Sequence, residues 1–291
     1  MNISVVIATV DRRDHLDRLL ACLSSQTVRP DEVVVSAPTL SDLCEDIERY
    51  TGWVKTVVGK RGASAQRNAA LDSLDPAAEL IVFFDDDMTI RSDYIENCAL
   101  AFVERPDIVG LTGELLGNGA RTGVPVTFNE ADAVLATSIQ PVSPTRIPVG
   151  DLYGCNFAVR AGAARDLRFD ERLPLYSWLE DLDFSRRLSQ RGSLIRDDSC
   201  LGVHHGSASG GRSQNLRYGY SQITNPVYLW KKGTIDGKRA MSLSLRPLTA
   251  NVVGAIWGHQ SEWRRARLRG NLLSISDLLR RRVTPERVTG L

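Results

Sequence analysis

One segment constrains the fold of this chain more than any other. Five apolar residues, Leu80 to Phe84, run directly into three carboxylates, Asp85, Asp86 and Asp87. An unbroken apolar run of this length is typical of a strand buried on both faces, as in a parallel sheet covered by helices. Open α/β sheets bind their ligands at the carboxyl ends of such strands. The segment therefore predicts a core strand with a binding site at its end.

The three carboxylates themselves indicate what binds there. Adjacent carboxylates repel one another, so their place beside a buried strand is costly unless something positive neutralises them. Side chains alternate along an extended chain, which lets Asp85 and Asp87 turn towards one ion. Carboxylate oxygens are hard ligands that suit Mg²⁺ or Mn²⁺. We therefore expect a divalent cation at this position; a solvated acidic turn is the alternative.

The first half of the chain alternates short β-branched runs with helical patterns, which is typical of βαβ units. We expect strands over residues 3–8, 32–35, 54–58, 80–84, 108–112 and 155–159, and a last one over 194–195 or 201–203. We expect helices over residues 64–74, 92–104 and 179–190. An earlier helix is expected from the apolar face formed by Leu16, Leu19, Leu20 and Leu23, with Asp11 and Asp14 as candidate caps. Residues 117–150 keep no period and predict a long surface excursion. The predicted fold class is α/β, with a mostly parallel central sheet flanked by helices.

Charge and composition exclude several classes of protein. The 36 Lys and Arg residues against 35 Asp and Glu give a net charge of +1, so no general affinity for nucleic acid is expected. The five cysteines are scattered and suggest reduced thiols. No secretion leader precedes the first expected strand, and no apolar run approaches the roughly 20 residues of a membrane helix. These features predict a cytoplasmic protein.

Two further segments carry groups that could take part in chemistry. Glu180 and Asp181 follow Trp178 at the start of an expected helix, where the helix dipole favours anions. Taken alone, they are better explained by compensation of that dipole. His204 and His205 follow an expected strand, and adjacent strand residues point to opposite faces. At most one of the two imidazoles is therefore expected to reach a given site.

In their order along the chain, these segments resemble the family 2 inverting glycosyltransferases of GT-A fold, of the kind that builds bacterial surface glycans. The resemblance covers about residues 1–225 and is carried by six motifs. They are an N-terminal Ser-Val-Val-Ile-Ala-Thr strand, Ala-Gln-Arg-Asn-Ala-Ala at 65–70, Phe-Asp-Asp-Asp at 84–87, Gly-Cys-Asn-Phe-Ala-Val-Arg at 154–160, Phe-Asp-Glu at 169–171 and Glu-Asp-Leu-Asp at 180–183.

The resemblance implies an enzyme that moves a sugar from a nucleoside diphosphate to an acceptor hydroxyl, with inversion and with Mn²⁺ or Mg²⁺, in polysaccharide or glycolipid synthesis. It implies a general base, Asp181, and a neighbour, Glu180, that positions the base or holds the acceptor. Trp178 is a further candidate for the acceptor site. The implied metal-side residues are Asp85, Asp87 and His204, which we prefer to His205. The implied donor contacts are Thr9, Asp11, Arg67, Asp85 and Asp86.

The sequence departs from the family pattern at one point. Family members usually carry an acidic residue straight after the second strand, whereas here Ser36, Ala37 and Pro38 follow it, so the nucleotide base stays open. A Rossmann oxidoreductase would need a glycine-rich turn after the first strand, and the segment from Ala8 to Arg12 contains no glycine. The remaining alternatives are a non-catalytic sugar- or nucleotide-binding relative and a nucleotidyltransferase.

The end of the chain differs from the rest in charge. From Arg246 onwards there are nine arginines and three acids, interleaved with apolar residues at helical spacing. We therefore divide the chain into a GT-A-like catalytic domain, residues 1–225, and a helical, Arg-rich extension, residues 226–291. Two interpretations of the extension stay equally open. It docks on an anionic membrane surface, which would suit a lipid-linked acceptor and peripheral attachment to the inner face of the cell membrane, or it packs against the catalytic domain or in a homo-oligomer.

Overall fold

The structure is a computed structural model that describes residues 1–141, 143–206, 214–257 and 261–291. Its described strands form one sheet in the order β3-β2-β1-β4-β8-β6-β9-β5, with β7 paired to β9. The strands are β1 (Ile3–Ala8), β2 (Glu32–Ala37), β3 (Val54–Val58), β4 (Leu80–Asp85), β5 (Met88–Ile90), β6 (Ile108–Asn118), β7 (Arg146–Pro148), β8 (Asn156–Arg160) and β9 (Ser193–His204).

The sheet is parallel over β3, β2, β1 and β4, as expected for the first half of the chain. Beyond β4 it is mixed, and four of the eight described pairings are antiparallel. The change comes from β8, which starts opposite Phe84 near the carboxyl end of β4 and therefore runs back along it. The expectation of a mostly parallel sheet thus holds for the N-terminal half.

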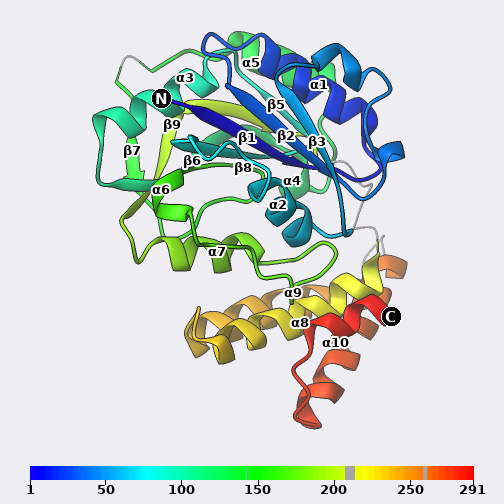
Figure 1. Ribbon diagram of the computed structural model, residues 1–291. Coiled ribbons are helices and arrows are strands. Elements are labelled where there is room, and N and C mark those ends of the chain that lie inside the picture. Colours follow the sequence, from blue (N-terminus) through cyan, green and yellow to red (C-terminus); the bar gives the residue numbers. More distant parts are fainter. Residues whose placement is uncertain (142, 207–213, 258–260) are drawn as a thin grey trace.

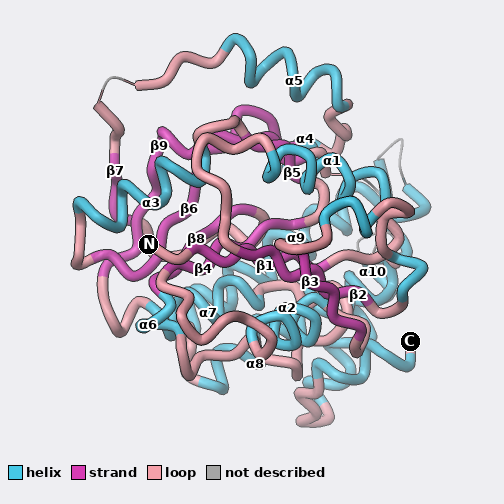
Figure 2. The backbone as a smooth tube through the Cα atoms, turned by 45° about the horizontal axis from the view of Figure 1, so that its top comes forward, coloured by secondary structure: helices cyan, strands magenta, loops and turns pink. Residues whose placement is uncertain are grey.

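Helices cover both faces of the sheet (Figures 1 and 2). On one face, Val5 and Ile7 of β1 share a buried apolar cluster with α1 (Arg13–Ser24) and α3 (Tyr94–Glu104). On the other face, Val6 shares a cluster with α2 (Ala63–Leu71), α6 (Ala161–Ala164) and α7 (Glu180–Leu188). The period-2 alternation of a strand buried on both sides explains this division.

Four phenylalanines hold α7 against the sheet. Phe83 of β4 stacks on Phe157 of β8 with 4.5 Å between ring centroids, and Phe169 stacks on Phe184 of α7 at 4.4 Å. Phe83 also meets Phe184 edge to face. Because Glu180 and Asp181 begin α7, this packing sets the distance between them and the end of β4.

Three further elements differ from the sequence expectations. The expected excursion over 117–150 contains the end of β6, α4 (Gly119–Thr122), α5 (Phe128–Thr137) and β7. The signal that we missed is a capping box, in which Thr127 and Glu130 bond each other's backbone N–H groups at the start of α5. The caps expected for α1 are wrong, because Arg12 occupies the N-cap position and makes no side-chain cap bond. Both candidates for the last strand belong to one strand, β9.

A helical C-terminal extension is present, as expected. We call α8 (Asn215–Lys232), α9 (Gly237–Trp257) and α10 (Ser261–Leu279) the C-terminal helices; they lie together below α7 in Figure 1. The boundary placed between residues 225 and 226 lies inside α8, so the helical extension begins at α8 in the structure. Leu182 of α7 and Leu229 of α8 share the apolar cluster that joins the extension to the α/β part. Among the described residues, no helix is long and apolar enough to cross a membrane.

Candidate active site

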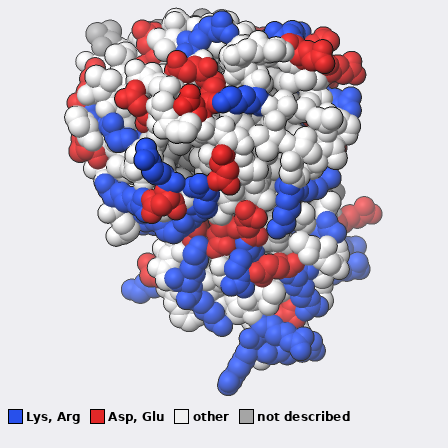
Figure 3. All heavy atoms as spheres, in the orientation of Figure 1, with Lys and Arg blue, Asp and Glu red and all other residues white. Residues whose placement is uncertain are grey.

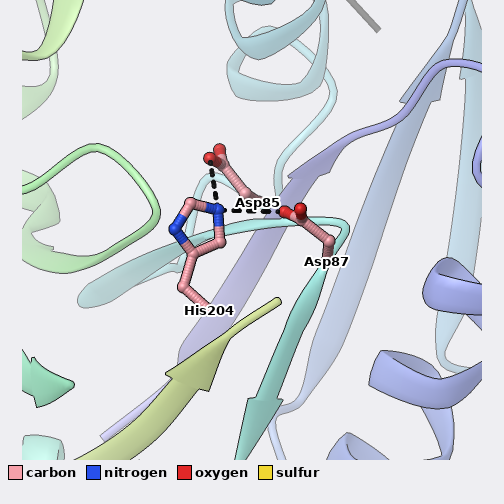
Figure 4. Close-up of side chains that lie close together, drawn as sticks. All are labelled: Asp85, Asp87 and His204. Atoms are coloured by element: carbon pink, nitrogen blue, oxygen red, sulfur yellow. Dashed lines mark ion pairs between the residues drawn. The ribbon is translucent and has the colours of Figure 1, made fainter. Parts of the chain in front are cut away.

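Asp85, Asp87 and His204 form a cluster at the carboxyl ends of β4 and β9 (Figure 4). His204 Nε2 lies 3.2 Å from Asp87 Oδ1 and 4.0 Å from Asp85 Oδ2, and the three ligand atoms lie within 4.8 Å of one another. The short strand β5 makes this arrangement, because its first residue, Met88, pairs with His204. Two carboxylate oxygens and one imidazole nitrogen form a donor set that fits Mn²⁺ or Mg²⁺.

The two adjacent histidines have different surroundings. His205 Nε2 is 2.7 Å from the hydroxyl of Thr89, and its Nδ1 is 2.7 Å from the carbonyl oxygen of Val126. Burial lowers the pKa of His205. Burial also acts to lower the pKa of His204, but Cys155 and Asp87 outweigh it and raise that pKa well above its usual value. The structure thus brings His204, and not His205, to the two carboxylates.

Asp86 is held by groups at the end of β1. Its side chain accepts hydrogen bonds from the Thr9 hydroxyl and from the Arg12 guanidinium, both at 2.8 Å. Arg12 also lies 3.2 Å from Asp87. Burial raises the pKa of Asp86 to about 6, although Arg12 opposes this effect. Arg12 therefore neutralises part of the acidic triplet, a role that the sequence analysis missed.

Arg67, in the middle of α2, connects the end of β4 with the start of α7. Its guanidinium donates to Glu180 Oε1 at 2.6 Å, to Asp85 Oδ1 at 2.8 Å and to the Gly154 carbonyl at 2.8 Å. The residue is only 2% exposed. We expected a donor contact here, and this expectation stays a prediction.

Asp181 is oriented by backbone donors. Its Oδ2 accepts from the Gly154 N–H at 3.0 Å, and its Oδ1 accepts from the Leu182 N–H at 2.8 Å. A Cβ atom on Gly154 would lie 2.9 Å from Oδ2, so only glycine allows this close approach. Burial raises the pKa of Asp181, and burial together with Asp181 raises the pKa of Glu180 to about 8.

A cavity of about 600 Å³ lies over these residues. Its lining includes the expected site residues Thr9, Arg67, Asp85, Asp86, Trp178, Glu180, Asp181 and His204. Asp87 lies just behind it and is 1% exposed. Asp11 is outside the lining; its side chain is exposed and bonds Arg61 at 3.0 Å.

The cavity is closed on one side by residues that the sequence analysis did not select. Arg217, Tyr218 and Ser221 of α8 line it opposite the α/β part. The ring centroid of Tyr218 lies 6.0 Å from that of Trp178 and 5.5 Å from that of Tyr176, and both pairs meet edge to face. No local motif marks these residues, because only the folding back of α8 brings them to the site.

The wall between α2 and α7 has an unusual backbone. Leu175, Ser177 and Leu179 have φ angles of 60°, 54° and 76°, in the left-handed region that non-glycine residues rarely adopt. The start of α2 holds this segment, since the Ala63 N–H donates to the Leu175 carbonyl at 2.9 Å. Such conformations cost on the order of 1–3 kcal/mol each and tend to cluster at functional sites.

Solved structures of glycosyltransferases share this fold. The match to S. aureus TarS 1–349 in complex with UDP-GlcNAc has a TM-score of 0.56 at 18% identity and covers 100% of this chain and 84% of that one. The match to the mannosyltransferase PcManGT from Pyrobaculum calidifontis, in complex with GDP-Man and Mn²⁺, has a TM-score of 0.56 at 12% identity and covers 95% and 87%. The chain spans 40% of the length of the longer TarS structure. No curated protein matches it.

The described part of the chain has the GT-A fold of these glycosyltransferases. The family model described as glycosyl transferase family 2 matches residues 4–167, which is more than half of the chain. The chain therefore belongs to glycosyl transferase family 2. The family and the fold class that the sequence motifs predicted are both confirmed.

Replacement of Arg67 by lysine should separate positioning from direct donor contact. Lysine is shorter and has one nitrogen in place of the two that bond Glu180 on one side and Asp85 and Gly154 on the other. We therefore expect turnover to fall by about 100-fold, the scale of a small misplacement of reacting groups. The donor dissociation constant should change by only a few-fold. Turnover rates and calorimetric titration of the donor measure the two effects. Arg168→Lys, which alters an exposed pair with Asp72, is the control. Weaker donor binding with unchanged turnover would instead make Arg67 a donor ligand.

Proposed function

We propose that this chain transfers a sugar from a nucleoside-diphosphate sugar to an acceptor hydroxyl, with inversion at the anomeric carbon and with the aid of a divalent cation. The observation that carries the proposal is the single cavity lined both by Asp85 and His204 and by Asp181. A donor held at the first two residues and an acceptor beside the third would meet in one space. The proposed acceptor is a glycan or a lipid-linked compound in polysaccharide or glycolipid synthesis.

The donor side is the end of β4. Asp85, Asp87 and His204 would hold Mn²⁺ or Mg²⁺, which supplies positive charge against the negative charge that develops on a departing diphosphate. Thr9 and Asp86 line the same part of the cavity and are proposed to contact the donor nucleotide or sugar. PcManGT was solved with GDP-Man and Mn²⁺, and TarS with UDP-GlcNAc, which supports a nucleotide-sugar donor.

Asp181 is the proposed general base. Its carboxylate takes the proton of the acceptor hydroxyl while that oxygen attacks the anomeric carbon and the bond from this carbon to the diphosphate oxygen breaks. Attack from the side opposite the leaving group inverts the configuration. Each carboxylate oxygen accepts one backbone N–H and keeps a further lone pair for this proton. Glu180, bonded to Arg67, is proposed to position the base and to bind the acceptor together with Trp178.

The metal assignment can be tested with two neighbouring histidines. We expect Asp87→Asn and His204→Asn to weaken the Mn²⁺-dependent binding of UDP or GDP by about 100-fold or more, since losing even an outer partner of a metal ligand costs 10- to 100-fold. His205→Asn is the matched control, because His205 bonds Thr89 and Val126 instead. Calorimetric titration with and without Mn²⁺ is the measurement. If both histidine variants lose the metal dependence equally, the assignment of His204 is wrong.

Asp181→Asn should leave donor binding nearly intact but lower turnover by roughly 10²- to 10⁴-fold, the usual contribution of a general base. The base must be ionised, and burial raises its pKa. Wild-type turnover should therefore fall with decreasing pH at values above the ordinary Asp range near 4, and the variant should lose this dependence. Asp166→Asn, an exposed carboxylate, serves as the control. A variant that loses donor binding while keeping its turnover at saturation would exclude Asp181 as the base.

Inversion can be measured directly. Nucleotide sugars are first screened for Mn²⁺- or Mg²⁺-dependent hydrolysis, and the accepted donor is then used for transfer to an acceptor. Proton NMR of the first product should show the opposite anomeric configuration to that of the donor. Retention of configuration would contradict the proposed single displacement, and absence of turnover with every donor would favour a non-catalytic binding protein.

A further inference from the structure

The C-terminal helices α9 and α10 place apolar side chains on the outside. On α9 the exposed positions follow one face of the helix, and the same holds for the second half of α10. We call these side chains the outer apolar face: Met241, Leu245, Val252, Val253, Ile256, Trp257, Leu272, Leu273 and Leu279. Trp257 is 77% exposed and Leu279 is 81% exposed. A gathering of large apolar side chains on a surface marks a site of interaction.

Polar side chains lie buried between α8, α9 and α10. Asn251 of α9 and Asn271 of α10 are fully buried, and Asn251 Nδ2 donates to Asn271 Oδ1 and to Gln222 Oε1 of α8, both at 2.8 Å. Asn271 Nδ2 donates to the Gly219 carbonyl at 2.7 Å. Tyr220 on α8 bonds the buried Asp277 of α10 at 2.9 Å.

Helices α8 and α10 approach each other closely at two glycines, Gly219 and Gly270. A Cβ atom on Gly219 would lie 2.1 Å from the Arg267 carbonyl oxygen, and one on Gly270 would lie 2.1 Å from the Leu216 carbonyl oxygen. Small residues at the crossing and polar side chains as partners are the packing mode of helices in lipid, where apolar burial between helices gives no advantage. The helices therefore pack as though their outer side met an apolar medium.

The charge around the outer apolar face indicates which apolar medium this is. Exposed arginines follow the same two helices and the turn after α10: Arg246, Arg265, Arg269, Arg280, Arg281 and Arg282. Figure 3 shows Lys and Arg gathered at the lower tip of the molecule, where Figure 1 draws the end of α10. Apolar side chains flanked by arginine are what an interfacial helix needs on an anionic bilayer.

We propose that α9 and α10 dock on an anionic lipid bilayer, lying along its surface with the outer apolar face in the headgroup region and the arginines at the lipid phosphates. A second copy of the chain is disfavoured by charge. A two-fold dimer would place the same surface against itself and bring the arginines of one copy towards those of the other.

Docking would have a consequence for the substrate, and this step rests on the proposed function. Helix α8 contacts both α9 and α10 and also lines the cavity with Arg217, Tyr218 and Ser221. The wall facing the acceptor side is therefore built on the element that carries the docking helices. This arrangement suits an acceptor hydroxyl on a lipid headgroup, which the bilayer would hold beside the cavity.

The docking is tested by sedimentation of the full-length chain with vesicles of phosphatidylcholine alone or mixed with phosphatidylglycerol. We expect binding to the anionic vesicles that weakens as salt rises from about 0.05 M to about 0.5 M, because salt screens the arginines. The triple variant Arg280→Gln, Arg281→Gln, Arg282→Gln should bind about 100-fold more weakly, since each basic residue near the surface contributes about 1 kcal/mol. The control replaces three exposed arginines elsewhere, Arg105, Arg121 and Arg165, by glutamine in the same way. It should have a much smaller effect.

The apolar contribution needs its own variant. Ile256→Ser with Trp257→Ser should weaken binding by at least 10-fold, whereas Val124→Ser with Ile139→Ser, equally exposed on the α/β part, should not. Unchanged thermal unfolding midpoints would verify that the variants fold, and donor hydrolysis measures the proposed function separately. No binding of the wild-type chain to anionic vesicles would overturn the proposal. So would a dimer, seen by sedimentation equilibrium, that the Trp257 variant dissociates.

Discussion

The guanidinium of Arg67 lies out of water between Asp85 at the end of β4 and Glu180 at the start of α7, and the geometry of the site depends on these contacts. Burial of an ion costs several kcal/mol, which only close partners and further hydrogen bonds offset. The Gly154 carbonyl supplies the third bond and places Gly154 where its N–H bonds Asp181. The Arg67 guanidinium thus links the end of β4, where the proposed metal would bind, to the proposed base.

Five carboxylates meet around this cavity: Asp85, Asp86, Asp87, Glu180 and Asp181. The partly buried Arg12 bonds Asp86 and Asp87, the buried Arg67 bonds Asp85 and Glu180, and Asp181 accepts from the Gly154 N–H. Burial, together with the excess of negative charge, raises the pKa values of Asp86, Glu180 and Asp181. Binding of a divalent cation at Asp85, Asp87 and His204 would relieve part of that excess. The same charge that makes the free site costly would therefore favour the proposed metal and, through it, a diphosphate.

Local patterns predicted the parts of the site that local patterns determine. The apolar run before Asp85 predicted a core strand with carboxylates at its end, and alternation along a strand predicted that one histidine of the pair reaches them. Arg67 was selected through its motif, but its partners come from β4 and α7, which only the fold brings together. Arg12 and Tyr218 carried no signal, because their roles depend on contacts with Asp86 and Trp178 far along the chain. The direction of β8 was missed for the same reason, since it depends on where the long segment before it re-enters the sheet.

The C-terminal helices show a different limit of sequence analysis. A period of 3.6 residues shows that a helix has an apolar face but not which face is buried. In α9 the pattern marks Val252, Val253, Ile256 and Trp257, yet the structure buries Asn251 and Ala255. Turning the helices to bury the apolar side would leave Asn251, Asn271 and their partners to find new hydrogen bonds, at a cost of about 1–3 kcal/mol for each unsatisfied group. The polar interior therefore stabilises an arrangement that leaves the outer apolar face exposed on the described part of the chain.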